Sequence, residues 1–124
     1  MTLISGKVIQ GKKRGKELGY PTANIILQEE IPQGIYISET LFDSKNYPSV
    51  TFIGNAVTFG EEEVFAETYI LNFNQDIYNM EITVQLIKKI RENEKFDSVE
   101  ELVKQIKEDV RLTQEYFELN TNSS

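Results

Sequence analysis

The chain has 124 residues, the length of one domain with a single core. Its formal net charge of −7 argues against general binding to nucleic acids or anionic membranes, because those partners require an excess of cations. It contains no cysteine and no histidine, which excludes disulfides and thiolate nucleophiles and leaves proton transfer near neutral pH to carboxylates, lysine, tyrosine or water.

No segment approaches the roughly 20 apolar residues of a membrane span, and the first five residues lack the features of a signal peptide. We therefore expect a cytoplasmic protein. Five of the thirteen lysines and arginines lie in residues 7–16, so the positive charge is concentrated in one loop. Such a loop suits a small anion better than a polymer.

Six strand-like runs, with apolar, β-branched and aromatic residues, precede any helical pattern. They are residues 3–10, 23–27, 34–41, 47–53, 64–73 and 80–88. The turn-forming residues 43–46 predict a hairpin between the third and fourth runs, and residues 54–60 are expected to form a loop before the acidic residues 61–63.

A capping-box pattern marks the start of the one predicted helix. Asp97 or Ser98 stands three residues before a glutamate, and apolar residues recur at helical spacing over residues 99–110. We expect this helix to end near Phe117.

The order of these elements predicts the architecture. Strands first and one amphipathic helix last indicate an antiparallel sheet, closed or nearly closed, with the helix over one opening. Residues 1–119 are expected to form the domain and residues 120–124 a disordered tail.

The segment of residues 6–25 has the chemistry of a phosphate site. Its four glycines let the backbone approach a ligand closely, and the interleaved cations supply positive charge. It ends in Pro-Thr-Ala-Asn, where Thr22 and Asn24 offer oxygen atoms that suit Mg²⁺ beside phosphates. We interpret the segment as a nucleotide–magnesium site.

This segment admits other interpretations. A P-loop is rejected because Lys13 occupies the position that requires Ser or Thr, and no helical pattern follows. The alternative for the loop is a glycine-rich hairpin with solvated lysines. The alternative for the tetrapeptide is a turn that enters a strand, with Asn24 bonded to its own backbone.

The same segment resembles the signature of the ATP-dependent riboflavin kinase family, Gly-x-Val-x-x-Gly followed by Gly-Arg/Lys-x-Leu-Gly-aromatic-Pro-Thr-Ala-Asn. Residues 67–73, 76–78 and 91–96 also match the family in order and spacing, so the resemblance covers nearly the whole chain. It implies a mainly β fold, a six-stranded antiparallel Greek-key barrel with a C-terminal α-helix packed on it. The nucleotide is expected at one side of the barrel and the flavin near the helix.

The resemblance implies a riboflavin kinase, which transfers the γ-phosphoryl group of ATP to the ribityl 5′-hydroxyl of riboflavin, with Mg²⁺ as cofactor, to give FMN. In many bacteria this domain is fused to an adenylyltransferase domain, for which 124 residues are too few. We expect any such domain on a longer or a separate chain. The alternative is a non-catalytic flavin- or nucleotide-binding regulatory module. An oligonucleotide-binding barrel is disfavoured by the net charge and the loop-confined lysines.

Within the resemblance, Thr22 and Asn24 match the residues that contact metal and phosphates. The implied ATP and phosphate site comprises Gly11, Lys12, Gly15, Lys16, Gly19, Pro21, Thr22 and Asn24. Lys16 replaces the family's commoner arginine, which keeps the charge but loses bidentate recognition of phosphate.

Glu67 is the candidate catalytic base. It is the only carboxylate in residues 64–71, and strand alternation places it on one face with Phe65, Tyr69 and Leu71. The residues alone leave open an edge carboxylate that reaches water. In the family, the matching glutamate is the proposed general base, which would deprotonate the ribityl hydroxyl as it attacks phosphorus.

Flavin binding is assigned through the resemblance to Arg91, Phe96 and Tyr78. The alternative for Arg91 is a surface arginine in a charged connector, and for Phe96 it is packing beneath the start of the helix. Tyr78 admits either interpretation. The chain departs from the family at Val57, where proline is common, and at Asn79, where glycine is usual; both are expected in turns, so the loop geometry around the substrate is in doubt.

Overall fold

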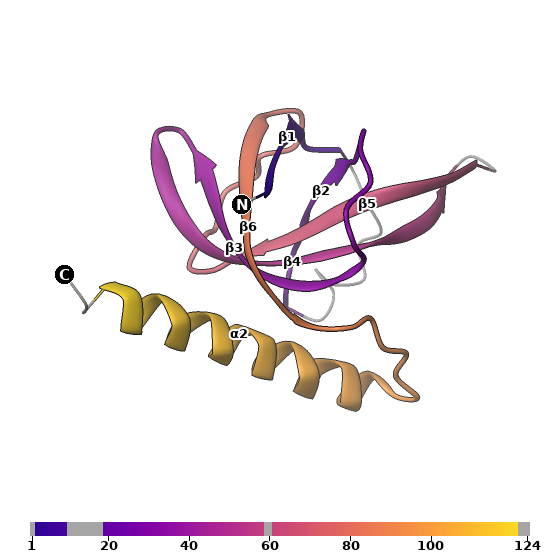
Figure 1. The fold of residues 1–124 in the computed structure, drawn as a ribbon, viewed down its shortest axis with the longest axis vertical. Helices are drawn as coiled ribbons and strands as arrows, with labels where there is room; N and C mark the ends of the chain where they lie inside the picture. Colours follow the sequence, from indigo (N-terminus) through magenta and orange to yellow (C-terminus); the bar gives the residue numbers. More distant parts are fainter. Residues whose placement is uncertain (1, 10–18, 59–60, 122–124) are drawn as a thin grey trace.

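The computed structural model describes residues 2–9, 19–58 and 61–121. Six antiparallel strands curl into a nearly closed barrel, and a long helix crosses the outside of it (Figure 1). The strands are β1 (Thr2–Lys7), β2 (Ala23–Ile26), β3 (Gly34–Phe42), β4 (Lys45–Thr58), β5 (Glu61–Ile70) and β6 (Glu81–Arg91), and the helix is α2 (Val99–Thr121). The predicted mainly β barrel with a C-terminal helix is confirmed.

The strand order in the sheet is β1-β6-β3-β4-β5-β2, so β1 and β2 are its two edges. These edges meet at one bridge, where the Ile9 N–H donates to the Asn24 carbonyl at 2.8 Å. The bridge nearly closes the barrel and fixes Asn24 at the seam.

The hairpin between β3 and β4 is confirmed. Asp43 and Ser44 form its two-residue turn with φ angles of 51° and 63°, while Phe42 pairs with Lys45. Positive φ at both central residues is typical of the type I′ turn, whose twist matches that of the flanking strands.

The predicted loop is wrong for residues 54–58, whereas residues 59 and 60 lie outside the described residues. Strand β4 continues to Thr58 and β5 begins at Glu61, with the backbone ladder unbroken between them. Gly54 fits inside this ladder because the Phe52 ring lies where a Cβ on residue 54 would be. Val57 therefore stands in a strand and not in the expected turn.

Helix α2 begins as predicted. The Ser98 hydroxyl accepts a hydrogen bond from the Glu101 N–H at 3.1 Å, which is the N-cap contact expected of the capping pattern. The helix does not end near Phe117 but continues to Thr121, so it includes the first two residues of the predicted tail. No helix in the described part of the chain is long and apolar enough to cross a membrane.

The barrel interior combines an apolar core with a chain of buried hydroxyls. Five side chains, each at most 1% exposed, bond in sequence across β3, β4 and β5 at 2.7–2.9 Å. The order is Thr40, Ser49, Ser38, Thr51 and Thr68. Buried hydroxyls are costly unless bonded, so this chain favours the one register in which all five meet.

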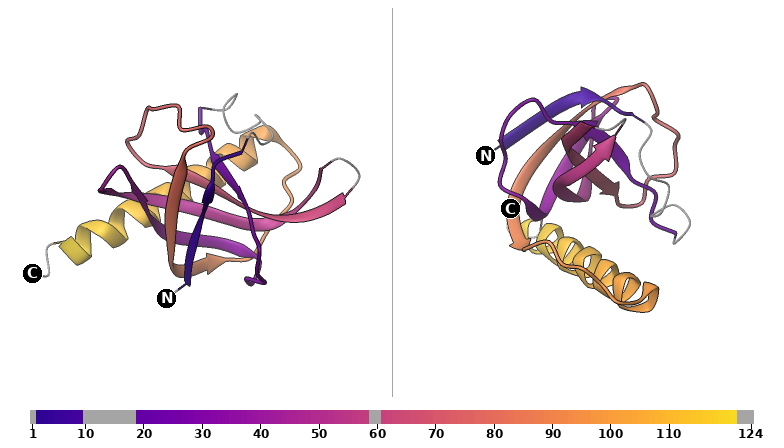
Figure 2. Two further views of the ribbon diagram at one scale, coloured as in Figure 1. Left: turned by 90° about the horizontal axis from the view of Figure 1, so that it is seen from above. Right: turned by 90° about the vertical axis from the view of Figure 1, so that its right-hand side faces the viewer.

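The outer face of β3, β4 and β5 lies beneath α2. Because side chains alternate along a strand, the residues between those that face the barrel interior point outwards, among them Ile35, Val50, Phe52 and Tyr69. Figure 2 shows α2 running along this side of the barrel, with the end of β6 and the following connector leading to it. Residues of the sheet and of α2 line a cavity between them.

Candidate functional site

A cavity of about 550 Å³ lies between the outer face of the barrel and α2. Its walls are mostly apolar, from Ile35, Val50, Phe52, Tyr20, Tyr69, Phe96, Leu102, Ile106 and Val110. Its polar side chains are Thr22, Glu67, Arg91, Glu94, Lys95 and Asp109. This volume and composition are typical of a site for a small organic molecule with a few polar groups.

Two tyrosines form an aromatic wall. The rings of Tyr20 and Tyr69 meet edge to face, with their centroids 5.3 Å apart. Burial raises the pKa of the Tyr69 hydroxyl, and the neighbouring Tyr20 raises it further. Tyr69 therefore remains a neutral hydroxyl at physiological pH and can donate or accept a hydrogen bond.

The structure brings Thr22, Asn24 and Glu67 together. Asn24 and Glu67 are directly paired residues of β2 and β5, so their side chains share one face of the sheet with Cβ atoms about 5 Å apart. Thr22 precedes Asn24 by two residues and lines the cavity together with Glu67. Asn24 is only 4% exposed, and its Nδ2 lies 3.5 Å from the Thr22 carbonyl oxygen that accepts its hydrogen bond.

Thr22 and Asn24 suit Mg²⁺ beside a phosphate. Hydroxyl and amide oxygens are hard donors of the kind that Mg²⁺ takes, and in phosphoryl-transfer sites the ion has few protein ligands and completes its shell with phosphates and water. Among the described residues no group of three acidic side chains is assembled to hold a metal. The hydroxyl of Thr22 and the amide of Asn24 are a donor set that fits an ion bound together with phosphate.

Arg91 is the last residue of β6, lies at the cavity wall and forms an ion pair with Asp109 of α2. Its Nε and Nη2 donate to the two carboxylate oxygens at 2.9 and 2.7 Å, while Nη1 donates to the Glu92 carbonyl at 3.2 Å. Asp109 is 3% exposed and also accepts from the Gln105 amide at 3.1 Å. This two-bond ion pair between Arg91 and Asp109, here called the fork, connects β6 to α2 where both border the cavity.

The connector between β6 and α2 supplies another part of the wall. The Arg91 guanidinium carbon lies 6.0 Å from the centroid of the Phe96 ring, and both side chains line the cavity. Asn93 fixes the connector by donating to the Ile53 carbonyl at 3.3 Å. Phe96 thus borders the space under the helix.

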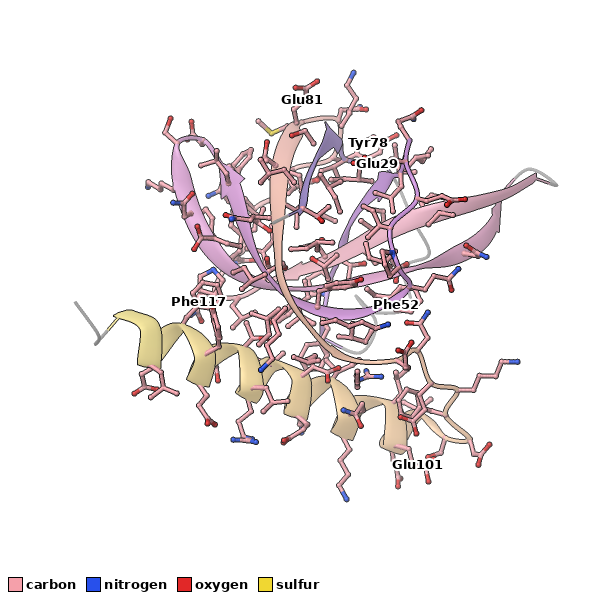
Figure 3. The ribbon with its side chains drawn as sticks, in the orientation of Figure 1. Glu29, Phe52, Tyr78, Glu81, Glu101 and Phe117 are labelled. Carbon is pink, nitrogen blue, oxygen red and sulfur yellow. The ribbon has the colours of Figure 1, made fainter. Side chains whose placement is uncertain are left out.

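Tyr78 does not join this group. It lies in the turn before β6, is 50% exposed, and does not line the cavity. Figure 3 shows it at the far end of the barrel from α2, whereas Phe52 lies between the strands and the helix. Asn79 beside it has a φ of 70°, a conformation that favours glycine and tolerates asparagine, which explains why either residue suits this turn.

The remaining predicted residues belong to the glycine-rich segment. Gly19, with a φ of 89°, and Pro21 flank Tyr20 and are exposed, and neither lines the cavity. Gly11, Lys12, Gly15 and Lys16 lie outside the described residues.

Sequence reasoning missed the contribution of α2. Leu102, Ile106 and Val110 recur every four residues and so form one stripe, which in the sequence indicates a helix but does not indicate a cavity wall. Asp109 interrupts the buried side of this helix with a carboxylate. An acidic residue within an apolar stripe is the sequence signal that could have identified Asp109.

Comparison with known proteins agrees with this geometry. The family model described as riboflavin kinase matches residues 1–117. The chain is 38% identical over 117 residues to a trifunctional protein RibF/MnmA of Mycoplasmoides gallisepticum, covering 92% of this chain and 18% of that protein. It is 37% identical over 121 residues to an RNA-binding riboflavin kinase, RibR, of Bacillus subtilis, covering 96% of this chain and 53% of that protein.

Two solved structures resemble this one. A riboflavin kinase from Trypanosoma brucei matches with a TM-score of 0.66 and 26% identity, over 94% of this chain and 79% of that one. A crystal structure described as a macrolide-efflux protein from Streptococcus pneumoniae matches with a TM-score of 0.82 and 38% identity, over 90% of this chain and 38% of that one. The chain spans about half or less of the curated relatives, and a family match over residues 1–117 places it in the riboflavin kinase family.

Proposed function

We propose that the chain phosphorylates riboflavin, transferring the γ-phosphoryl group of ATP to the ribityl 5′-hydroxyl to give FMN and ADP. The observation that carries the proposal is the placement of Glu67: the carboxylate lines the aromatic cavity and pairs in the sheet with Asn24, beside Thr22. This placement supports the proposal, because the proposed base and the proposed metal donors would lie together beside the mostly apolar cavity.

The aromatic and apolar walls suit the isoalloxazine ring. Phe52 and Tyr69 on the barrel face Ile106 and Val110 on α2 across the cavity, so a flat ring system can lie between sheet and helix. Arg91 offers N–H donors to the polar edge of the ring. The ribityl chain then extends towards Glu67.

Glu67 serves as the general base. Its carboxylate accepts the proton of the 5′-hydroxyl while that oxygen forms a bond to the γ-phosphorus, and the bond from this phosphorus to the leaving oxygen of ADP breaks. When bound, Mg²⁺ supplies positive charge for the phosphate oxygens. Thr22 and Asn24 would hold the ion, and most of the acceleration comes from positioning and electrostatics.

The glycine-rich segment completes the proposal on the nucleotide side. Its cations and glycines, including Lys12 and Lys16, would receive the phosphates of ATP. Support for this part comes from the family signature in the sequence. Relatives named as bifunctional riboflavin kinase/FMN adenylyltransferase lead us to propose that the FMN passes to an adenylyltransferase on a longer or a separate chain.

The test is a flavin product assay. The purified chain is incubated with riboflavin, ATP and Mg²⁺, and flavins are separated by chromatography, with each component omitted in turn. FMN should form only in the complete mixture. Riboflavin that quenches on binding but stays unphosphorylated would indicate the non-catalytic binding module, and the absence of both binding and turnover would refute the flavin assignment.

A further inference from the structure

The Arg91–Asp109 pair is the most enclosed ion pair of the described residues. The side chain of Asp109 is 4% exposed and that of Arg91 20%, whereas the ion pairs made by Lys89 and Arg111 lie at the surface. Replacing a buried ion pair with apolar residues of similar volume is often neutral or stabilising. Stability alone therefore gives little reason for a charged pair at this place.

Asp109 is not available to bind a ligand directly. Its Oδ1 accepts from Arg91 Nε and from the Gln105 amide, its Oδ2 accepts from Arg91 Nη2, and the Thr113 hydroxyl bonds its backbone carbonyl. Both carboxylate oxygens are thus engaged within the protein. Any effect of Asp109 on a molecule in the cavity must pass through Arg91.

Arg91 retains donors for a ligand. A guanidinium has five N–H donors, and the hydrogen bonds to Asp109 and Glu92 use three of them. The fork fixes the plane of the guanidinium, and the Phe96 ring 6.0 Å away borders the same space. Two donors therefore remain on a rigid group in the cavity wall.

We propose that Asp109 is a positioning residue for flavin binding, which holds the Arg91 guanidinium in the orientation that donates to a carbonyl oxygen or ring nitrogen of the isoalloxazine. The proposal rests on the proposed function and adds to it a residue that contributes to specificity for the flavin. Since the fork joins β6 to α2, the same contact also holds the two walls of the cavity at a fixed separation.

The test compares three variants. Asp109→Asn keeps the size of the side chain but loses the fork, and Arg91→Lys keeps the charge but loses the planar donors. The double variant Arg91→Met with Asp109→Leu replaces the pair by apolar groups. The control is Asp43→Asn, the same chemical change in the exposed β3–β4 turn.

Riboflavin affinity is measured by fluorescence quenching, the KM for ATP by turnover, and Tm by thermal unfolding. Asp109→Asn and Arg91→Lys should weaken riboflavin binding about 10- to 100-fold, the loss expected for a charge-assisted hydrogen bond, and leave the KM for ATP within about twofold. The double variant should recover the thermal stability but not the riboflavin affinity. The control should match the wild type.

Two results would overturn the inference. The first is recovery of riboflavin affinity in the double variant, which would show that the pair only docks the helix. The second is wild-type affinity in Asp109→Asn or Arg91→Lys. A wild-type chain that neither binds nor phosphorylates riboflavin would instead refute the proposed function and this inference with it.

Discussion

The substitution Glu67→Gln removes the proposed base and keeps the shape of the side chain. Glu67 lies in β5 between its sheet neighbours Asn24 and Phe52, where the backbone ladder does not depend on the side chain. The side chain is half-buried, so we expect Glu67→Gln to change the free energy of unfolding by less than about 1 kcal/mol. A change in kcat will then report on the chemical step.

The size of the effect follows from the role. General base catalysis contributes about 10²- to 10⁴-fold, so kcat should fall by this factor, which corresponds to a barrier increase of about 2.7–5.4 kcal/mol. The KM for riboflavin should change little, because the apolar walls and Arg91 remain. The assay is steady-state FMN formation at saturating ATP, with Tm measured on the same samples.

Glu94→Gln is the matched control. Glu94 lines the same cavity and carries the same charge, but it comes from the connector after β6 and not from the strand face that holds Asn24. It should retain kcat within about threefold of the wild type. If Glu67→Gln also stays within that range, Glu67 is not the base; if both variants fall equally, the effect is one of overall charge.

Three further predictions concern the cavity wall, the barrel interior and an ionisable ring. Val110→Phe should weaken riboflavin binding at least about tenfold in a fluorescence titration, because the phenylalanine ring fills the cavity. The control Val99→Phe, on the exposed first turn of α2, should leave the affinity unchanged. Equal affinities in the two variants would place the flavin elsewhere. Thr51→Val removes a hydroxyl that bonds two buried neighbours and should cost about 1–3 kcal/mol in denaturant unfolding, and a loss below about 0.5 kcal/mol would contradict the role of the hydroxyl chain. Burial raises the pKa of Tyr69 above its usual value near 10, so the associated stability is present below that pH and is lost as pH rises through the folded pKa. Tyr69→Phe should therefore make the alkaline loss of stability less steep, and an unchanged slope would refute this.

The sequence pattern correctly predicted the elements that depend only on neighbouring residues. The Asp43 turn and the Ser98 cap each depend on a few neighbouring residues, and both were found where expected. The error at residues 54–58 arises because Gly54 resembles a loop residue in the sequence, whereas in the fold it makes room for the nearby Phe52 ring and continues the ladder, paired with Phe65 of β5. The local pattern around Gly54 does not show that pairing with β5.

The site was predicted in part, and for different reasons. The family signature indicated Thr22, Asn24 and Glu67, but only the register of β2 and β5 shows that Asn24 and Glu67 face each other. In the sequence the motif that contains Tyr78 comes shortly before the motif that contains Arg91. In the barrel, however, Tyr78 lies at the opposite end from α2. Asp109 remained unnoticed because its partner is eighteen residues away in another element.

The five buried hydroxyls show a further limit. Ser and Thr are common on exposed strand faces, so Thr40 and Thr51 gave no sign of being fully buried. Their burial is permitted only because strands from different parts of the chain bring hydroxyl partners within 2.7–2.9 Å. Such a network depends on the completed sheet.

The measurement that tests the account most directly follows the phosphoryl group itself. Wild-type chain and Glu67→Gln are mixed with riboflavin, Mg²⁺ and ATP labelled in the γ-phosphate, and label in the flavin fraction is followed with time. The account predicts labelled FMN from the wild type and a rate lowered about 10²- to 10⁴-fold in the variant. Unlabelled flavin from the wild type, or equal labelling by both proteins, would contradict phosphoryl transfer at this cavity.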